Sequence, residues 1–444
     1  MKNLNTIIGS IKVLTNYLSK RVECVPQKMS SSKQVLGYDV IPLFKYNVAG
    51  AFPKRKLVFA PFFLHFISTI LSISLSRGFY FMNNSHILHL CFKTFVFLFL
   101  IFIPLWAQER QSVDSLMKQI DKKFEALNHR LDQLDKAVDD VQWYNKVGDI
   151  ASIDKVFIVG PPPAKAKDST ARGAWNPVKF WAYVFIPQKL DRNKKYPMLV
   201  LPHGGVHGDF TTYHTHIIRE MMAQGYIVVA PEYRGSTGYG KDFYERIDYG
   251  GREVEDNHAA RDWMVENCRF VDSTRIGAIG WSHGGLITLL DIFEHPNTYQ
   301  VAFAGVPVSD LVMRMGYYDD DYRKDFYAKY HIGKTVSEDS TEYLRRSPVT
   351  YVNKLRTPLL IHTNTNDDDV HVEEVKHLIE DLKAAGKKFD FEIFQEAPGG
   401  HSFDRIDTKL AKQIRMKIYK FLAQYLNPPH QFKSLADLEK AGYK

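Results

Sequence analysis

The feature that most constrains the fold is an alternation of short apolar runs with longer amphipathic stretches through the second half of the chain. The runs have the length and composition of buried strands, and apolar residues between them recur at helical spacing. Such a pattern predicts an α/β fold: a mostly parallel sheet with helices on both faces. The predicted strands are 179–187, 198–202, 226–231, 275–280, 301–308, 358–364 and 389–394, and the predicted helices are 212–223, 253–266, 285–294, 373–385 and 408–425.

The net charge of +8 is concentrated in the N-terminal quarter of the chain. Residues 1–107 hold 12 Lys and Arg against two acids, which leaves 46 basic and 48 acidic residues in the remainder. Because the body of the protein is close to neutral, the basic balance gives no support to nucleic-acid binding by it. No nucleic-acid partner is expected.

Thr94 to Ala107 is an uncharged apolar run. It is short for a membrane-spanning helix, which needs about 20 residues, and it suits the apolar region of a signal peptide. Residues 82–107 are therefore predicted to be a signal peptide or membrane anchor, and the protein to be exported, periplasmic or secreted. Residues 1–81 are predicted to be an upstream extension outside the working protein. Their apolar stretch Leu57 to Leu75 leaves open a transmembrane hairpin with the second run.

Residues 108–147 carry a heptad pattern, with polar residues between the apolar positions. Apolar residues spaced alternately by four and three predict one long amphipathic helix. Two uses of its apolar seam are open: packing against the chain's own catalytic domain, or a homo-oligomeric coiled coil through 113–141. The seam consists of Val113, Met117, Ile120, Phe124, Leu127, Leu131, Leu134, Val138 and Val141.

Gly280-Trp-Ser282-His-Gly284 lies where the predicted strand 275–280 meets the predicted helix 285–294. A G-x-S-x-G motif in this context is a nucleophile elbow, in which a strained turn projects the serine hydroxyl above the sheet. Side chains at positions 280 and 284 would clash in so tight a turn, which explains the glycines. Ser282 is the predicted nucleophile.

Three further segments supply the partners that such a nucleophile needs. Asp367 follows the strand 358–364, and His401 follows the last strand, so the order Ser, Asp, His is that of an α/β-hydrolase fold. His401 would take the serine proton while Asp367 orients it. The backbone N–H groups of Gly205 and His283 are predicted to form the oxyanion hole, although a plain glycine turn at 203–205 is the alternative.

The sequence predicts neither a metal nor a cofactor. The triple-Asp turn at 367–369 lacks the spacing of an EF-hand loop, and a solvated loop or Ca²⁺ binding is its alternative reading. The histidines outside the triad show no third ligand at a spacing typical of zinc. These are His203, His207, His258, His362 and His371.

Together these segments resemble the catalytic domain of the prolyl oligopeptidase family (peptidase family S9), over residues 175–426. The resemblance implies that Asp367 is the triad acid, and that Val308, Tyr318, Tyr322 and Val370 line the pocket for the residue before the scissile bond; ordinary packing is the alternative for these four. The motifs that carry it are HGG (203–205), EYRGSTGYG (232–240), GWSHGG (280–285), PVSD (307–310), SPVTYVNKLRTPLLIH (347–362), DDDV (367–370) and GGHSF (399–403).

The chain departs from the family in two places. Val206 stands where the family usually has proline after HGG, and the large β-propeller that gates substrates in much of the family has no counterpart. Only about 70 residues separate Ala107 from the strand at 179–187, and roughly 30 of them belong to the heptad helix. The hydrolase domain is predicted at 148–430, with a C-terminal tail at 431–444.

The sequence therefore predicts an exported serine peptidase that cleaves short peptides through an acyl-enzyme on Ser282. A carboxylesterase acting on small or carbohydrate esters is the second hypothesis, because the same triad and oxyanion hole serve both reactions. A non-catalytic scaffold assembled through the heptad helix is the third. The expected partners are a peptide or small ester substrate, a second copy of the chain through 113–141, and a membrane through the N-terminal apolar segments.

Overall fold

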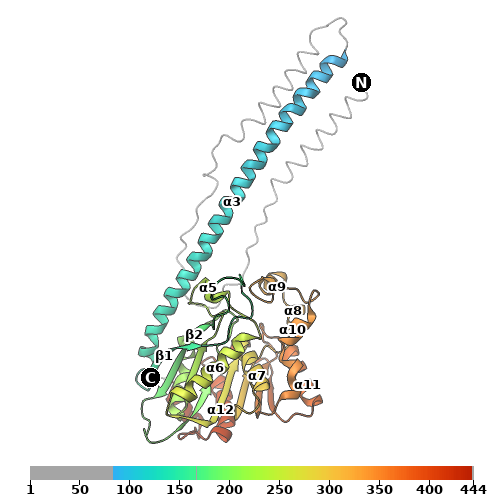
Figure 1. Cartoon of the computed structure of the whole chain (residues 1–444). Helices are drawn as coiled ribbons and strands as arrows, with labels where there is room; N and C mark the ends of the chain where they lie inside the picture. Colours follow the sequence, from blue (N-terminus) through green and yellow to red (C-terminus); the bar gives the residue numbers. More distant parts are fainter. Residues whose placement is uncertain (1–83, 167, 443–444) are drawn as a thin grey trace. The chain divides into compact units, whose positions relative to one another are not determined.

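The computed structural model describes residues 84–166 and 168–442, in which a compact unit starts at Leu105 (Figure 1). Its sheet has the strand order β1-β2-β4-β3-β5-β6-β7-β8. The pairs β1–β2 and β2–β4 are antiparallel, and the others are parallel. The strands are β1 (Ala151–Val159), β2 (Lys179–Pro187), β3 (Tyr196–Val200), β4 (Ile227–Glu232), β5 (Val271–Trp281), β6 (Val301–Gly305), β7 (Leu359–Asn364) and β8 (Asp390–Phe394).

The predicted α/β architecture is confirmed, and each predicted strand has a counterpart in the sheet. Sequence reasoning missed β1, which directly follows the helix-breaking Gly148. This strand lies at the sheet edge and pairs with β2 alone, so several of its residues stay exposed. Its periodicity is therefore weaker than that of a strand buried on both faces.

Five helices match the predicted helical stretches to within a few residues, whereas the short helices between β6 and β7 were not predicted. The C-terminal tail contains one more helix, whose Leu438 is fully buried. The helices after β3 are η2 (Thr212–His214), α4 (Thr215–Gln224), α5 (Lys241–Tyr244), α6 (Arg252–Asn267), α7 (His283–Glu294), α8 (Leu311–Tyr317), α9 (Asp320–Tyr327), α10 (Ser340–Arg345), η3 (Pro348–Lys354), α11 (Val372–Ala384), η4 (Gly400–Ser402), α12 (Lys409–Leu426) and α13 (Leu435–Gly442).

The core consists of two apolar layers, one on each face of the sheet. Along β4, Ile227 and Val229 belong to one layer and Val228 and Ala230 to the other, because successive strand residues point to opposite faces. Helices α6, α7 and α11 cover the first face, and α4, α12 and α13 cover the second. Figure 1 shows α6, α7 and α12 packed along the sheet. The parallel strands thus end at one edge of a rigid platform, where loops can carry a site.

Helix α3 (Asn84–Val147) contains the heptad segment predicted for 108–147, and it ends just before Gly148 as expected. The helix begins further upstream than predicted, so the apolar run Thr94 to Ala107 is helical and continuous with the heptads. No stretch of helix among the described residues combines the length and apolarity needed to cross a bilayer. The predictions for residues 1–81 lie outside the described part of the chain.

Helix α3 contacts the catalytic domain mainly through polar side chains. The Lys136 ammonium is buried and lies 2.5 Å from the carboxylate of Glu232, at the end of β4, and 3.1 Å from that of Asp209. Burial alone would lower the pKa of Lys136, but these carboxylates outweigh it and raise the pKa. One turn before the helix ends, Trp143 is fully buried and stacks on Phe210. A buried ion pair therefore fixes which face of α3 lies against the domain.

Replacing Lys136 by methionine is expected to destabilise the protein by about 3–5 kcal/mol at pH 8, because Glu232 keeps a buried charge without a counter-charge. Burial raises the pKa of Glu232, and loss of the ammonium raises it further. Between these pH values Glu232 is therefore protonated in the folded variant but ionised in the unfolded chain. The loss of unfolding free energy relative to wild type should shrink as the pH falls from 8 towards 5. Denaturant unfolding of Lys136→Met and wild type at both pH values measures this.

The double variant Lys136→Met/Glu232→Gln removes both charges and is the matched control. It should recover much of the lost stability at pH 8 and show little of the pH dependence of the single variant. A single variant as stable as wild type at pH 8 would contradict the importance of this ion pair.

Candidate active site

Ser282 occupies the sharp turn between β5 and α7, with φ 59° and ψ −122°. Positive φ is rare for a residue with a side chain and costs about 1–3 kcal/mol. A Cβ on Gly280 would lie 2.2 Å from the carbonyl oxygen of Gly284, and a Cβ on Gly284 would lie 2.3 Å from the carbonyl oxygen of Pro202. The predicted clash within the turn is therefore found for Gly280, whereas Gly284 is constrained by the segment after β3. The serine side chain lies at the carboxyl edge of the sheet.

Asp367 and His401 are brought together across the loops that follow β7 and β8. His401 Nδ1 lies 2.9 Å from both carboxylate oxygens of Asp367, which also accepts backbone hydrogen bonds from Asp369 and Val370. The His401 loop turns through Gly399, at φ 106°, and Gly400, at φ 51°. With Nδ1 engaged by the aspartate, Nε2 is the ring nitrogen that remains to exchange a proton. The geometry is that of an acid that orients a base.

The segment after β3 packs its glycines directly against the elbow. A Cβ on Gly204 would lie 3.4 Å from that of Ser282, and Gly205 adopts φ 76°, which favours glycine. The hydroxyl of Tyr233 donates to the carbonyl of Gly205 over 2.9 Å, and its ring stacks on His203. This loop, 203–205, is thus held in a fixed shape next to the nucleophile.

His283 is the first residue of α7, so its backbone N–H has no acceptor within the helix. The positive end of the helix dipole lies at the same place, and both features suit a developing negative charge. His283 follows Ser282 directly in the chain, and Gly204, the neighbour of Gly205, packs against Ser282 from the segment after β3. The roles of Gly205 and His283 in binding an oxyanion stay a prediction.

Two of the four predicted pocket residues surround Arg314 of α8. The guanidinium lies 4.7 Å from the ring centre of Tyr318 and donates to the hydroxyl of Tyr322, and the two rings stack at 3.6 Å. Arg314 also forms a 2.6 Å ion pair with Asp369 and lies 3.7 Å from Glu374, which is fully buried. Together they form a charged cluster beside His401.

Sequence reasoning did not identify Arg314, Asp369 or Glu374 as parts of the site. The triple-Asp turn at 367–369 was the available signal for Asp369, whereas no sequence pattern marked Arg314 or Glu374. Asp369 also lies 3.8 Å from His401 Nε2. Burial acts to raise the pKa of Asp369, but the charges of Arg314 and His401 prevail and lower it. A second carboxylate therefore stays ionised beside His401.

The other two predicted pocket residues have buried side chains. Val308 is 1% exposed, and its backbone N–H donates to the Ser282 carbonyl over 3.2 Å. Val370 is fully buried, and its N–H donates to Asp367. Both belong to the apolar layer under α7, which fits the packing alternative, and their role in a substrate pocket stays a prediction.

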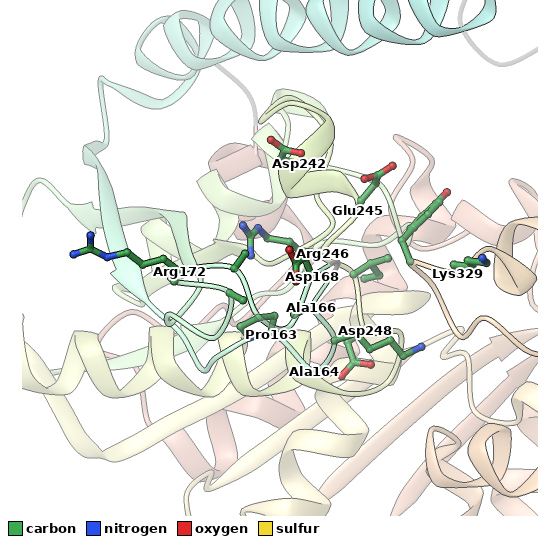
Figure 2. Close-up of a pocket in the computed structure, with 16 residues that line it drawn as sticks. Pro163, Ala164, Ala166, Asp168, Arg172, Asp242, Glu245, Arg246, Asp248 and Lys329 are labelled. Carbon is green, nitrogen blue, oxygen red and sulfur yellow. The ribbon is translucent and has the colours of Figure 1, made fainter. Parts of the chain in front are cut away.

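A cavity of about 910 Å³ lies near the loop 203–205, which we call the oxyanion loop after its predicted role. In Figure 2, the segment of Pro163 and Ala164 lies on one side of the cavity, and Asp242 and Glu245 lie on the opposite side. Its lining includes Tyr330, whose ring lies near that of His207, just after the oxyanion loop. The triad residues do not line it, so the cavity neighbours the reaction centre without containing it.

The described residues also hold a cluster of potential metal ligands at the far end of α7. Ligand atoms of His258, Asp291 and His295 lie within 4.8 Å of one another, and Glu255 and Glu294 lie beside His295. However, His258 Nδ1 lies 3.0 Å from an oxygen of Asp291, and the two imidazole rings stack at 3.6 Å. Stacked rings do not direct their nitrogens at a common point, so an ion pair and a ring stack account for this cluster.

Comparison with known proteins extends the geometric interpretation. Residues 212–429 match the model of the prolyl oligopeptidase family. A protein named "Uncharacterized peptidase YuxL" from Bacillus subtilis is 30% identical over 221 residues, which are 49% of this chain and 33% of the relative. The mouse acylamino-acid-releasing enzyme is 28% identical over 245 residues, covering 52% of this chain and 31% of that enzyme. The match thus spans about a third of each relative.

Solved structures show the same fold. The uncomplexed acylaminoacyl peptidase of Pyrococcus horikoshii superposes with a TM-score of 0.51 at 21% identity, over 65% of this chain and 44% of that one. At this identity the likeness concerns the fold alone. It agrees with the mostly parallel sheet covered by helices on both faces. The range of the family match spans the positions of Ser282, Asp367 and His401. Over residues 212–429, this chain belongs to the prolyl oligopeptidase family.

Proposed function

We propose that this protein is a serine peptidase that cleaves short peptides through an acyl-enzyme on Ser282. The observation that carries the proposal is the bidentate contact between His401 and Asp367 on the same sheet edge as the strained Ser282. A buried carboxylate fixes the tautomer of the histidine and stabilises the imidazolium that forms when the serine loses its proton. The family match over 212–429 supports the same chemistry.

In the proposed reaction, Ser282 Oγ attacks the carbonyl carbon of the substrate while His401 Nε2 takes the hydroxyl proton. The carbonyl oxygen becomes negatively charged and accepts hydrogen bonds from the backbone N–H groups of Gly205 and His283. His401 then returns the proton to the leaving amine, and the C–N bond breaks. Water, deprotonated by the same histidine, hydrolyses the ester on Ser282 and restores the enzyme.

The substrate class rests on the relatives, several of which are named acylamino-acid-releasing enzymes. On that ground we propose acylated amino acids and short peptides as the first substrates to test. The carboxylesterase hypothesis uses the same residues and predicts turnover of esters but not of amides. Export through residues 82–107 remains a prediction from the sequence.

Fluorophosphonate labelling of the full-length protein tests the nucleophile. Wild type should be labelled, and Ser282→Ala should lose both the label and at least about 10⁴-fold in kcat on an acyl-amino-acid p-nitroanilide, because the reacting oxygen is gone. Ser337→Ala, at an exposed position, is the matched control and should behave as wild type.

The outcomes separate the three hypotheses. Hydrolysis of p-nitrophenyl esters without any hydrolysis of anilides would favour the esterase. Folded wild type that takes no label would contradict catalysis and leave the scaffold hypothesis.

Tyr233→Phe tests whether the oxyanion loop must be held in place. The buried hydroxyl donates to the carbonyls of His203 and Gly205, so its removal should loosen the loop without touching the substrate. We expect kcat to fall about tenfold with KM nearly unchanged, because the loop acts on the transition state. Steady-state kinetics on the anilide measure this. An increase of KM at constant kcat would assign Tyr233 to substrate binding instead.

A further inference from the structure

The apolar seam of α3 lies on the solvent side of the helix. Its side chains are at least half exposed from Met117 onwards, apart from the partly buried Ile120. The exposed fractions are 52% for Met117, 61% for Phe124, 52% for Leu127, 50% for Leu131, 60% for Leu134, 51% for Val138 and 64% for Val141. A continuous apolar strip of this length is unusual on a protein surface and marks an interaction site.

The seam follows a 3.5-residue repeat, which keeps one side of a helix facing another helix along a left-handed supercoil. In heptad notation, the a positions are Met117, Phe124, Leu131 and Val138. The d positions are Val113, Ile120, Leu127, Leu134 and Val141. From Val113 to Val141 the strip is about 43 Å long at 1.5 Å per residue. That is about four heptads, which is enough for a stable coiled coil.

The opposite side of α3 is the one that contacts the catalytic domain. The contacting side chains between positions 125 and 143 all occupy heptad positions b, c and f. They are Glu125 to Lys241, His129 to Tyr244, Gln133 next to Gly240, Lys136 to Glu232, Asp139 to Thr212, Asp140 to Lys155, and Trp143 in the core. Positions a, d, e and g are the ones that a two-stranded coiled coil uses, and in α3 they face away from the domain.

The charges beside the seam match a second copy of the same helix in one orientation. Position e holds Asp114, Asp121 and Asp135, and position g holds Lys123 and Arg130, all exposed. In a parallel pair, g of one helix faces e of the next heptad of its partner, which places Arg130 opposite Asp135. In an antiparallel pair, e faces e and g faces g, so acid would meet acid and base would meet base. Neither Arg130 nor Asp135 forms an ion pair within the described residues.

We propose that the apolar face of α3 binds the same face of a second copy of this chain, as a parallel two-stranded coiled coil through 113–141. The positions b, c and f hold a catalytic domain on the outer side of each helix, so the two domains lie on opposite sides of the seam. The pairing buries the exposed apolar residues and adds two symmetric Arg130–Asp135 pairs.

Analytical ultracentrifugation of the full-length protein tests the pairing. Wild type should sediment as a dimer, and Leu127→Asp/Leu134→Asp should be monomeric because two charges lie in the seam. The matched control, Gln119→Asp/Ala126→Asp, adds the same charges at exposed c positions and should remain dimeric. A monomeric wild type would overturn the proposal, whether the seam is then covered by residues 1–83 or by another protein. Fluorophosphonate labelling of the Leu127/Leu134 variant should persist, which separates this test from that of the proposed function.

Two further experiments test orientation. Arg130→Glu should weaken the dimer on the order of tenfold, and the charge-exchanged Arg130→Glu/Asp135→Arg should restore it. With the three native cysteines replaced by serine, Leu134→Cys should form a disulfide between the two copies, because d positions meet in register in a parallel pair. Gln119→Cys should not. A dimer that Leu134→Cys fails to cross-link, or that Arg130→Glu strengthens, would overturn the parallel arrangement.

Discussion

The strained backbone of Ser282 is the constraint on which the rest of the site depends. A residue with a side chain holds positive φ only where its neighbours leave no alternative. Here its N–H donates to the Gly305 carbonyl over 3.0 Å, and its own carbonyl accepts from Leu286 and Val308. Strand β6, helix α7 and the loop after β6 therefore fix the turn from three sides. The cost of the strain is offset by the sheet and by α7, whose inner face is fully buried.

The order of the strands then determines which loops meet at the serine. Strand β5 lies between β3 and β6, so the oxyanion loop after β3 is its direct neighbour. The strands β7 and β8, which precede Asp367 and His401, follow on the β6 side. Because β3 to β8 are parallel, their carboxyl ends lie along one edge, and segments more than 100 residues apart in sequence converge there. The placement of Ser282, Asp367 and His401 on loops at one edge of the sheet is thus a consequence of topology.

This explains how much the sequence could predict. Strands such as β4 are apolar on both faces, and the elbow has a short motif between a strand and a helix, so both can be predicted from local sequence pattern. Arg314 is different, because its partners Asp369 and Glu374 lie more than 50 residues away in the sequence, and no sequence pattern predicts these contacts. The edge strand β1 was not predicted for a related reason. It pairs with β2 alone, so its exposed and buried residues do not form a clear pattern in the sequence. Local sequence encodes local geometry, whereas buried charges depend on the completed fold.

The difference between apolar patterns and buried charges also gives a reason for the polar contacts of α3. The heptad pattern identifies an apolar seam, and by burial alone that seam would be the face to pack on the catalytic domain. A buried ion pair such as Lys136–Glu232 adds little net stability, yet it is strongly selective, because any other rotation of the helix leaves Glu232 buried without a counter-charge. If α3 packed on the catalytic domain through apolar side chains, the seam itself would be buried against the domain. Docking through charge avoids this and leaves the apolar residues free for a partner helix.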